Sequence, residues 1–313
     1  MQALVTGASG FVGNRLCAAL ADAGHTVRAM TRRPRVYTGI GEPVYGDVGN
    51  PESLRAALAG CDVAYYLVHA LDDADFARRD ADAASEFGTA AAEAGVKRII
   101  YLGGLGDDAD SLSPHLRSRR DVEGLLGVGG VPVTTLRAGI VVGHGGISWE
   151  MTRQVVEHVP APLVAPNWVR TRTQPIAVAD VVRYLVEVLD VPETAGRAFD
   201  IGGSEVLTYQ EMLERVAAIE GRFRKIVPVP LLGTLLSPPV SWLWMASRWM
   251  GLGLWLVTDI DVQTGRNLIE SMNNEVIVRD NSIRELVPFE PMNYDRAVLE
   301  ALAERAAARR NAS

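Results

Sequence analysis

Three glycines near the start of the chain have the spacing of a phosphate-binding turn. Gly7, Gly10 and Gly13 lie in the segment ALVTGASGFVGNRL, directly after a short apolar run and at the start of an amphipathic stretch. The first glycine allows a tight bend, the second lets backbone amides approach a pyrophosphate, and the third permits close packing of helix on strand. The N-terminus of the following helix then faces the anion. The sequence therefore predicts a dinucleotide site formed by main-chain groups.

Two arginines occur where dinucleotide-binding chains contact the adenosine ribose. Arg32 and Arg33 lie in the segment MTRRPR, beginning nineteen residues beyond Gly13. A chain that prefers NAD carries a carboxylate here, which accepts hydrogen bonds from the ribose hydroxyls. This sequence has no acid at that place, and guanidinium groups pair with a 2′-phosphate in fork geometry. We therefore expect NADP(H) to be preferred over NAD(H). The alternative is a solvated basic loop.

Alternating strands and helices are expected to position these residues. Short apolar runs with helical segments between them cover residues 3–6, 27–30, 44–45, 63–68, 98–102 and 133–140. This alternation predicts βαβ units in an α/β, doubly wound parallel sheet (Rossmann-like), with a smaller, mostly helical C-terminal region on the substrate side. The expected dinucleotide-binding domain covers residues 1–150, residues 170–202 return to it, and residues 203–313 form the C-terminal substrate or lid region.

Composition limits the classes of partner. The 313 residues carry 38 acidic and 31 basic side chains, a net charge of −7, so nucleic acid is not an expected partner. Two cysteines, Cys17 and Cys61, are too few for a disulfide framework or a zinc cluster, so no metal site is expected and both are interpreted as buried. The N-terminus has no secretory signal pattern, which predicts a cytoplasmic protein.

Motifs along most of the chain resemble one protein family. The turn TGASGFVG has the spacing GxxGxxG, and RIIYLGGLG, HLRSRRDVEGLL, TLRAGIVVG, QPIAVADVVRYL and FDIGG follow in order. Together they resemble extended and atypical short-chain dehydrogenases/reductases, in particular an uncharacterised bacterial branch related to NmrA-like and complex I accessory-subunit proteins. The resemblance implies a fold but supplies no substrate. With the glycine turn it implies a set of cofactor-binding residues: Gly7, Ser9, Gly10, Phe11, Val12, Gly13, Asp47, Val48, Leu67, His69 and Gly103. For Asp47, a turn or helix-start carboxylate is an equally good interpretation.

The catalytic positions depart from the pattern of this family. Active members carry a Ser or Thr at the end of strand five and a Tyr-x-x-x-Lys on the next helix. Here the strand ends in Gly103 and Gly104, and the helix has His115-Leu-Arg-Ser-Arg119, which places His115 and Arg119 on one helical face. Our hypothesis is that His115 donates a proton near neutral pH while Arg119 holds ribose hydroxyls and a developing oxyanion.

This arrangement predicts an NADPH-dependent oxidoreductase that reduces a hydrophobic carbonyl, enone or quinone-like small molecule. The alternative is a non-catalytic NADP(H)-binding redox sensor or assembly factor, in which His115 only caps or packs. Trp168, Arg170 and Arg172 lie in or beside TRTQPIAVADV, which resembles the segment that frames the substrate in the family. Two arginines two residues apart in an extended segment project the same way and fit an anionic or carbonyl-bearing ligand, although solvated loop charges are the ordinary alternative.

Four of the six tryptophans fall in one C-terminal stretch, PVSWLWMASRWMGLGLWLV. Three interpretations are open: a helix packed on the main domain, a lid over the nicotinamide, or docking on a membrane surface or a second subunit, as in a homodimer. We favour the lid, with Trp242 against the substrate, because a reductase of this fold needs an enclosed apolar site. Residues 226–247 carry no charge, but prolines divide them, so a membrane span is not expected while peripheral membrane contact stays open.

Overall fold

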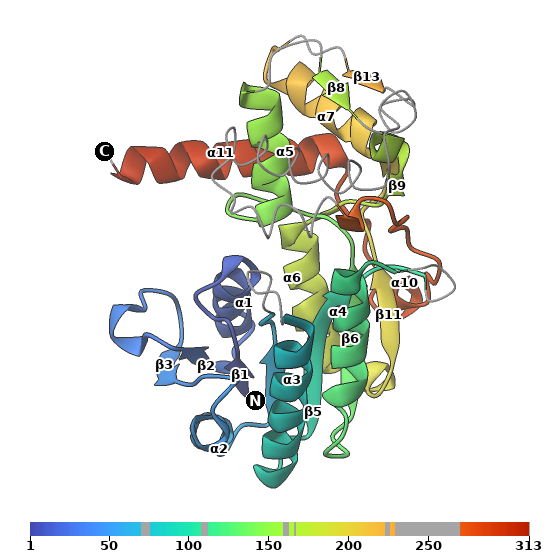
Figure 1. Cartoon of the computed structure of the whole chain (residues 1–313). Coiled ribbons are helices and arrows are strands. Elements are labelled where there is room, and N and C mark those ends of the chain that lie inside the picture. Colours follow the sequence, from blue (N-terminus) through green and yellow to red (C-terminus); the bar gives the residue numbers. More distant parts are fainter. Residues whose placement is uncertain are drawn as a thin grey trace.

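A seven-stranded parallel sheet organises most of the chain. The computed structural model describes residues 1–69, 76–107, 112–158, 163–165, 167–222, 226–228 and 270–312. The strand order is β11-β6-β5-β4-β1-β2-β3, and every pairing in this sheet is parallel (Figure 1). The strands are β1 (Gln2–Val5), β2 (Thr26–Thr31), β3 (Glu42–Tyr45), β4 (Val63–Tyr66), β5 (Arg98–Gly104), β6 (Val133–Ala138) and β11 (Ala198–Ile201). The chain reverses direction across the sheet at β1 and β4, so this is the doubly wound α/β fold that the sequence predicts.

Helices cover both faces of the sheet. One face packs against α1 (Phe11–Asp22) and α6 (Val178–Glu187), and the other packs against α2 (Pro51–Leu58), α3 (Phe76–Glu93) and α4 (Pro114–Leu125). Strand β1 shows why: Ala3 and Val5 belong to the apolar cluster on the α1 and α6 side of the sheet, whereas Leu4 between them belongs to the cluster on the α2, α3 and α4 side. Because successive strand side chains alternate in direction, a strand apolar throughout is buried on both faces.

A second apolar cluster lies beyond the carboxyl edge of the sheet. It joins α5 (Ile147–His158), α7 (Tyr209–Ile219) and α11 (Tyr294–Ala312), with Trp149, Met212 and Val298 almost fully buried. Figure 1 shows these helices above the sheet. Three short pairings accompany them: β7 (Val141–Val142) with β10 (Ile176–Ala177), β9 (Arg172–Thr173) with β12 (Leu207–Thr208), and β8 (Leu163–Ala165) with β13 (Ile226–Pro228). The remaining elements are α10 (Ile283–Leu286) and the 3-10 turns η1 (Pro34–Val36), η2 (Asn167–Arg170), η3 (Val188–Asp190) and η4 (Pro192–Thr194). The domain limits of the sequence analysis stay a prediction.

A buried arginine ties together the amino end of the sheet. Arg98, the first residue of β5, donates to the hydroxyl of Thr134 on β6 (2.8 Å) and to the carbonyl of Val188 in η3 (2.8 Å). It also donates to the hydroxyl of Thr194 in η4. Burial lowers the pKa of this guanidinium. The cost of burying the charge is offset because its donors meet neutral oxygen acceptors on three elements.

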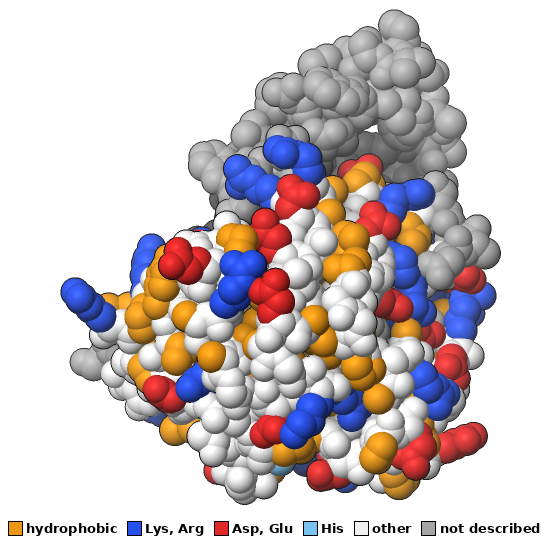
Figure 2. All heavy atoms as spheres, turned by 90° about the horizontal axis from the view of Figure 1, so that it is seen from below, with side chains coloured by type: hydrophobic (Ala, Val, Ile, Leu, Met, Phe, Trp, Pro, Cys, Tyr) orange, Lys and Arg blue, Asp and Glu red, His pale blue; other side chains and the backbone are white. Residues whose placement is uncertain are grey.

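The cysteines, the helices and the surface charges bear on the possible partners of the protein. Cys17 and Cys61 are both buried and free. Among the described residues, no helix combines the length and the apolar character needed to cross a membrane. Figure 2 shows that acidic, basic and apolar side chains are interspersed on the face seen from below.

Candidate functional site

The glycine turn has the geometry that a bound pyrophosphate requires. Gly7 adopts a φ of +63°, in the left-handed region that favours glycine. A Cβ on Gly13 would lie 2.2 Å from the carbonyl oxygen of Gly7, so α1 packs on the turn only because Gly13 has no side chain. Helix α1 starts after Gly10 with no side-chain cap and no acid in its first turn. Its first amides therefore remain available to an anion.

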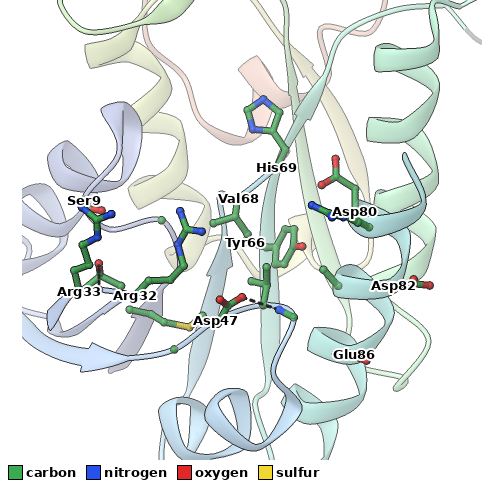
Figure 3. Close-up of a pocket in the computed structure, with 18 of the residues that line it drawn as sticks. Ser9, Arg32, Arg33, Asp47, Tyr66, Val68, His69, Asp80, Asp82 and Glu86 are labelled. Atoms are coloured by element: carbon green, nitrogen blue, oxygen red, sulfur yellow. Dashed lines mark hydrogen bonds between the residues drawn. The ribbon is translucent and has the colours of Figure 1, made fainter. Parts of the chain in front are cut away.

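A cavity of about 1100 Å³ opens beside this turn. It runs from the turn along the carboxyl ends of β2 and β4 to helix α3 (Figure 3). The residues expected at a cofactor that line it are Gly7, Ser9, Arg32, Arg33, Asp47, Val48 and His69. Residues from four separate segments of the sequence thus meet around one cavity, as the predicted topology requires.

The two arginines lie exposed at the end of β2. Figure 3 shows Arg32 and Arg33 on the same side of the cavity as Ser9. Among the described residues, neither guanidinium has an ion-pair partner, so both charges are available to a ligand. Asp47 lines the cavity as well, and its Oδ1 accepts a hydrogen bond from the amide of Gly49 (3.0 Å). Asp47 is therefore both a turn-forming carboxylate and a cavity residue.

Other residues expected at the cofactor lie just outside the lining. The ring of Phe11 packs against the loop that precedes α5, where a Cβ on Gly146 would lie 2.8 Å from it. Val12 packs against the apolar cluster between α1 and the sheet. Leu67 donates its amide hydrogen to the hydroxyl of Thr6 (2.9 Å), which fixes the chain leaving β4 beside the turn. Gly103 is buried near the end of β5. Gly10 and Gly13, at the start of α1, complete the set.

The structure brings His69, His115 and Arg119 together. The imidazole rings of His69, after β4, and His115, in the first turn of α4, have centroids 5.9 Å apart. Arg119, one helical turn beyond His115, donates to the carbonyl of Leu102, and its guanidinium lies 5.5 Å from the centre of the Tyr101 ring. Arg119 is thus held against the end of β5, close to both histidines.

The surroundings of the two histidines disfavour their charged forms. Desolvation, and secondly the positive charge of Arg119, lower the pKa of His115 from 6.5 to about 4. Desolvation, Arg119 and His115 also lower the pKa of His69, although its side chain lies exposed at the cavity. His115 is therefore predominantly neutral at pH 7. This weighs against an imidazolium as the proton donor near neutral pH, whereas a neutral imidazole still donates a hydrogen bond.

Three tyrosines on β4 and β5 differ in their hydrogen-bond partners and in their position relative to the cavity. Tyr65 donates to the carbonyl of Leu185 (2.9 Å) and Tyr101 donates to the carbonyl of Arg119 (3.1 Å). Tyr66 lines the cavity, with its ring between β4 and α3 in Figure 3. Burial raises the pKa of all three phenols. Of the three, Tyr66 is the one on the cavity wall.

Three of the residues expected at the substrate, Trp168, Arg170 and Arg172, do not line the cavity. Trp168 and Arg170 are in η2, and the Trp168 ring meets Tyr209 edge-on at 6.0 Å in the second apolar cluster. Arg172 forms a two-pronged ion pair with Glu275 (2.7 and 3.1 Å). That guanidinium is therefore already neutralised by a carboxylate. Trp242 lies outside the described residues, and the substrate roles of all four stay predictions.

One wall of the cavity was not predicted from the sequence. Helix α3 contributes Arg79, Asp82, Ala83 and Glu86, which recur at i, i+3, i+4 and i+7, together with the buried Asp80. This spacing places them on one helical face, which was the available signal. The pattern alone does not predict a cavity wall, because polar residues at helical spacing ordinarily indicate a helix face exposed to solvent.

Comparisons with known proteins agree with this geometry. Residues 7–157 match the family described as NAD(P)H-binding. A relative from Streptomyces griseus, (4-alkanoyl-5-oxo-2,5-dihydrofuran-3-yl)methyl phosphate reductase, is 30% identical over 230 residues, which cover 70% of this chain and 74% of the relative. Photosystem II assembly factor Ycf39 from Trieres chinensis is 24% identical over 238 residues, covering 74% and 73%. The NADPH-dependent quinone oxidoreductase QOR2 from Escherichia coli, solved with NADPH, superposes with a TM-score of 0.71 at 18% identity over 96% of this chain and 99% of that chain.

The fold and the cavity define a dinucleotide-binding protein of the Rossmann type. Within that class, the chain belongs to the NAD(P)H-binding family of atypical short-chain dehydrogenases/reductases. Relatives of this chain include proteins named as reductases and proteins named as assembly factors.

Proposed function

We propose that this protein is an NADPH-dependent oxidoreductase that reduces a hydrophobic carbonyl, enone or quinone-like small molecule. The observation that carries the proposal is the shared cavity. An uncapped helix N-terminus with its glycine turn lies on the same wall as two arginines without acidic partners among the described residues. A dinucleotide with a 2′-phosphate fits this set, because the turn receives its pyrophosphate and the arginines receive its additional phosphate.

In this proposal each group of residues has a separate role. The first amides of α1 bind the pyrophosphate, Arg32 and Arg33 bind the 2′-phosphate, and Asp47 and Val48 lie beside the adenine. When bound, the cofactor supplies a hydride from its nicotinamide ring. His115 donates a hydrogen bond from its neutral imidazole to the substrate oxygen, and Arg119 stabilises negative charge that develops there. The proton that completes the alcohol comes from water.

Calorimetry with NADPH and NADH tests the cofactor preference. Each charge-assisted hydrogen bond contributes about 1.5–3 kcal/mol, so the Arg32→Ala/Arg33→Ala variant should bind NADPH at least about 10-fold more weakly. Its NADH affinity should change less than about 2-fold, since NADH lacks that phosphate. Arg35→Ala is the matched control, because Arg35 is an exposed arginine of the same loop that does not line the cavity. Equal affinities of the wild type for NADPH and NADH would contradict the proposed binding of the 2′-phosphate by Arg32 and Arg33.

A second candidate is a non-catalytic NADP(H)-binding redox sensor or assembly factor. The observation that favours it is the replacement of the family's tyrosine and lysine by His115 and Arg119, together with the likeness to an assembly factor. Oxidation of NADPH across a panel of carbonyls and quinones separates the two. The reductase turns over, and His115→Ala slows it, whereas the sensor binds NADPH and leaves the whole panel unreduced.

A further inference from the structure

We propose that residues 270–280 form a positioning segment for helix α4, in which Ser271 and Asn274 hold the first turn of the helix and thereby His115. The inference rests on the proposed function, because it concerns the residue assigned there to the substrate oxygen. Ser271 and Asn274 are positioning residues in this proposal, since they act through Ser113 and touch no substrate.

The N-cap of α4 is held by two side chains from this segment. The side-chain oxygen of Asn274 accepts a hydrogen bond from the backbone amide of Ser113 (3.1 Å). The hydroxyl of Ser113 accepts from the amide of Leu116 (3.3 Å) and lies 3.0 Å from the hydroxyl of Ser271. The Ser113 hydroxyl thus caps the helix and at the same time shares a hydrogen bond with the Ser271 hydroxyl. The carbonyl of Ser113 accepts from the amide of Arg117 (2.9 Å), so every polar group of this buried cap is committed to the helix start or to the segment.

The segment is itself fixed to the rest of the protein. The carbonyl of Val276 accepts from the amide of Gln174 (2.9 Å), and the side chain of Gln174 accepts from the amide of Val278 (3.0 Å). Val276 also packs with Leu116 and Leu105 in a small buried apolar cluster. The segment therefore connects α4 with the chain around β9, including the Arg172–Glu275 ion pair. These contacts fix the position of α4, and therefore of His115, relative to the second apolar cluster.

Loss of the anchor should expose His115 to water. His115 follows the cap by two residues, and removal of the Asn274 oxygen leaves a buried amide without an acceptor. A helix start relieves such an amide by fraying into water. The groups that face His115 are the charged Arg119 on α4 and the neutral, titratable His69 after β4, while Glu275 and Arg279 of the segment are paired with Arg172 and Asp107. Hydration would then raise the pKa of His115 from about 4 toward 6.5.

The test compares two neighbouring asparagines by NMR titration of the His115 imidazole in the full-length protein. Asn273→Ala is the control, because the Asn273 side chain is exposed and donates only within its own turn, to the carbonyl of Glu270. Asn274→Ala should raise the pKa of His115 by about one unit or more, whereas Asn273→Ala should leave it unchanged. Asn274→Asp, which keeps an acceptor for the Ser113 amide, should hold the helix start in place and lower kcat less than Asn274→Ala does.

The outcomes separate this inference from the proposed function. An unchanged His115 pKa in Asn274→Ala, with the wild-type fold by circular dichroism, overturns the positioning role. If Asn274→Ala does not fold, Ser271→Ala is titrated in its place, and an unchanged pKa there overturns the role equally. Absence of turnover on every carbonyl tested would contradict the proposed reductase and leave the titration result as it stands. With turnover, kcat of Asn274→Ala should fall at least about 5-fold while KM changes less than 2-fold, since misplacing a group that acts in the transition state lowers kcat.

Discussion

The packing of α1 on the glycine turn makes the substitution Gly13→Ala a sharp test of the site. In a helix, alanine is about 1 kcal/mol more favourable than glycine, so the substitution would be stabilising wherever space allows. At Gly13 the new Cβ would lie 2.2 Å from the Gly7 carbonyl oxygen and 3.0 Å from Cα of Ala8. These are backbone atoms that cannot rotate away, so the turn or the helix must shift. Overpacking of this kind costs about 1–3 kcal/mol, and the depth of the overlap favours the upper end.

The net expectation is that Gly13→Ala lowers the unfolding free energy by about 2 kcal/mol, after subtracting the helix-propensity gain from the overlap. With a urea m-value of about 3 kcal/mol/M, the unfolding midpoint falls by about 0.7 M. Gly124→Ala is the matched control, because Gly124 is also helical and a Cβ there meets nothing within 4 Å. Its midpoint should rise by about 0.3 M. In calorimetry, Gly13→Ala should also weaken NADPH binding at least about 10-fold, since the amides at the start of α1 move. A Gly13→Ala protein with the wild-type midpoint and NADPH affinity would refute the assignment of the turn.

Two further predictions concern stability. Arg98→Ala should lower the unfolding free energy by about 2–4 kcal/mol in urea denaturation, because it leaves buried acceptors without a donor. Arg55→Ala, which removes an exposed ion pair with Glu93, should change the urea midpoint only slightly. Below pH 6.5 the unfolded chain binds a proton at His115 that the folded protein binds only near pH 4, so stability falls as the pH drops through that window. At pH 5 the loss of unfolding free energy is about 2 kcal/mol. In His115→Gln, whose side chain does not titrate, the unfolding free energy should fall by about 2 kcal/mol less between pH 7 and pH 5. Parallel plots of unfolding free energy against pH for the two proteins would contradict the lowered pKa.

Local patterns in the sequence were sufficient to predict the fold and one wall of the cavity. The glycine turn is a contiguous motif, and Arg32 and Arg33 follow from the known offset between that turn and the end of the next strand. Strand β11 has the alternating pattern of an edge strand, with Phe199 and Ile201 buried and Ala198 and Asp200 partly exposed. The confirmed fold class rests on such short-range features.

The remainder of the site depends on contacts between distant residues. The sequence leaves Arg172 open as a ligand contact or a solvated charge, but its carboxylate partner Glu275 lies 103 residues further along the chain. Helix α4 is predicted from the resemblance of HLRSRRDVEGLL to the family, whereas its anchor in residues 270–280 has no local signature. The lowered pKa of His115 arises from desolvation and from Arg119, and desolvation can be evaluated only when the surrounding elements are in place. The Trp-rich stretch falls outside the described residues, so the lid stays a prediction.

The buried guanidinium of Arg98 also constrains the order in which the chain can fold. Its acceptors lie 36, 90 and 96 residues later in the sequence, at Thr134, Val188 and Thr194. Until those residues arrive, β5 can enter the centre of the sheet only by burying an unsatisfied charge. A chain that ends after β5 lacks all three acceptors, so placing β5 as in the native sheet would leave this guanidinium without them. The native position of β5 thus depends on residues up to 96 positions further along the chain.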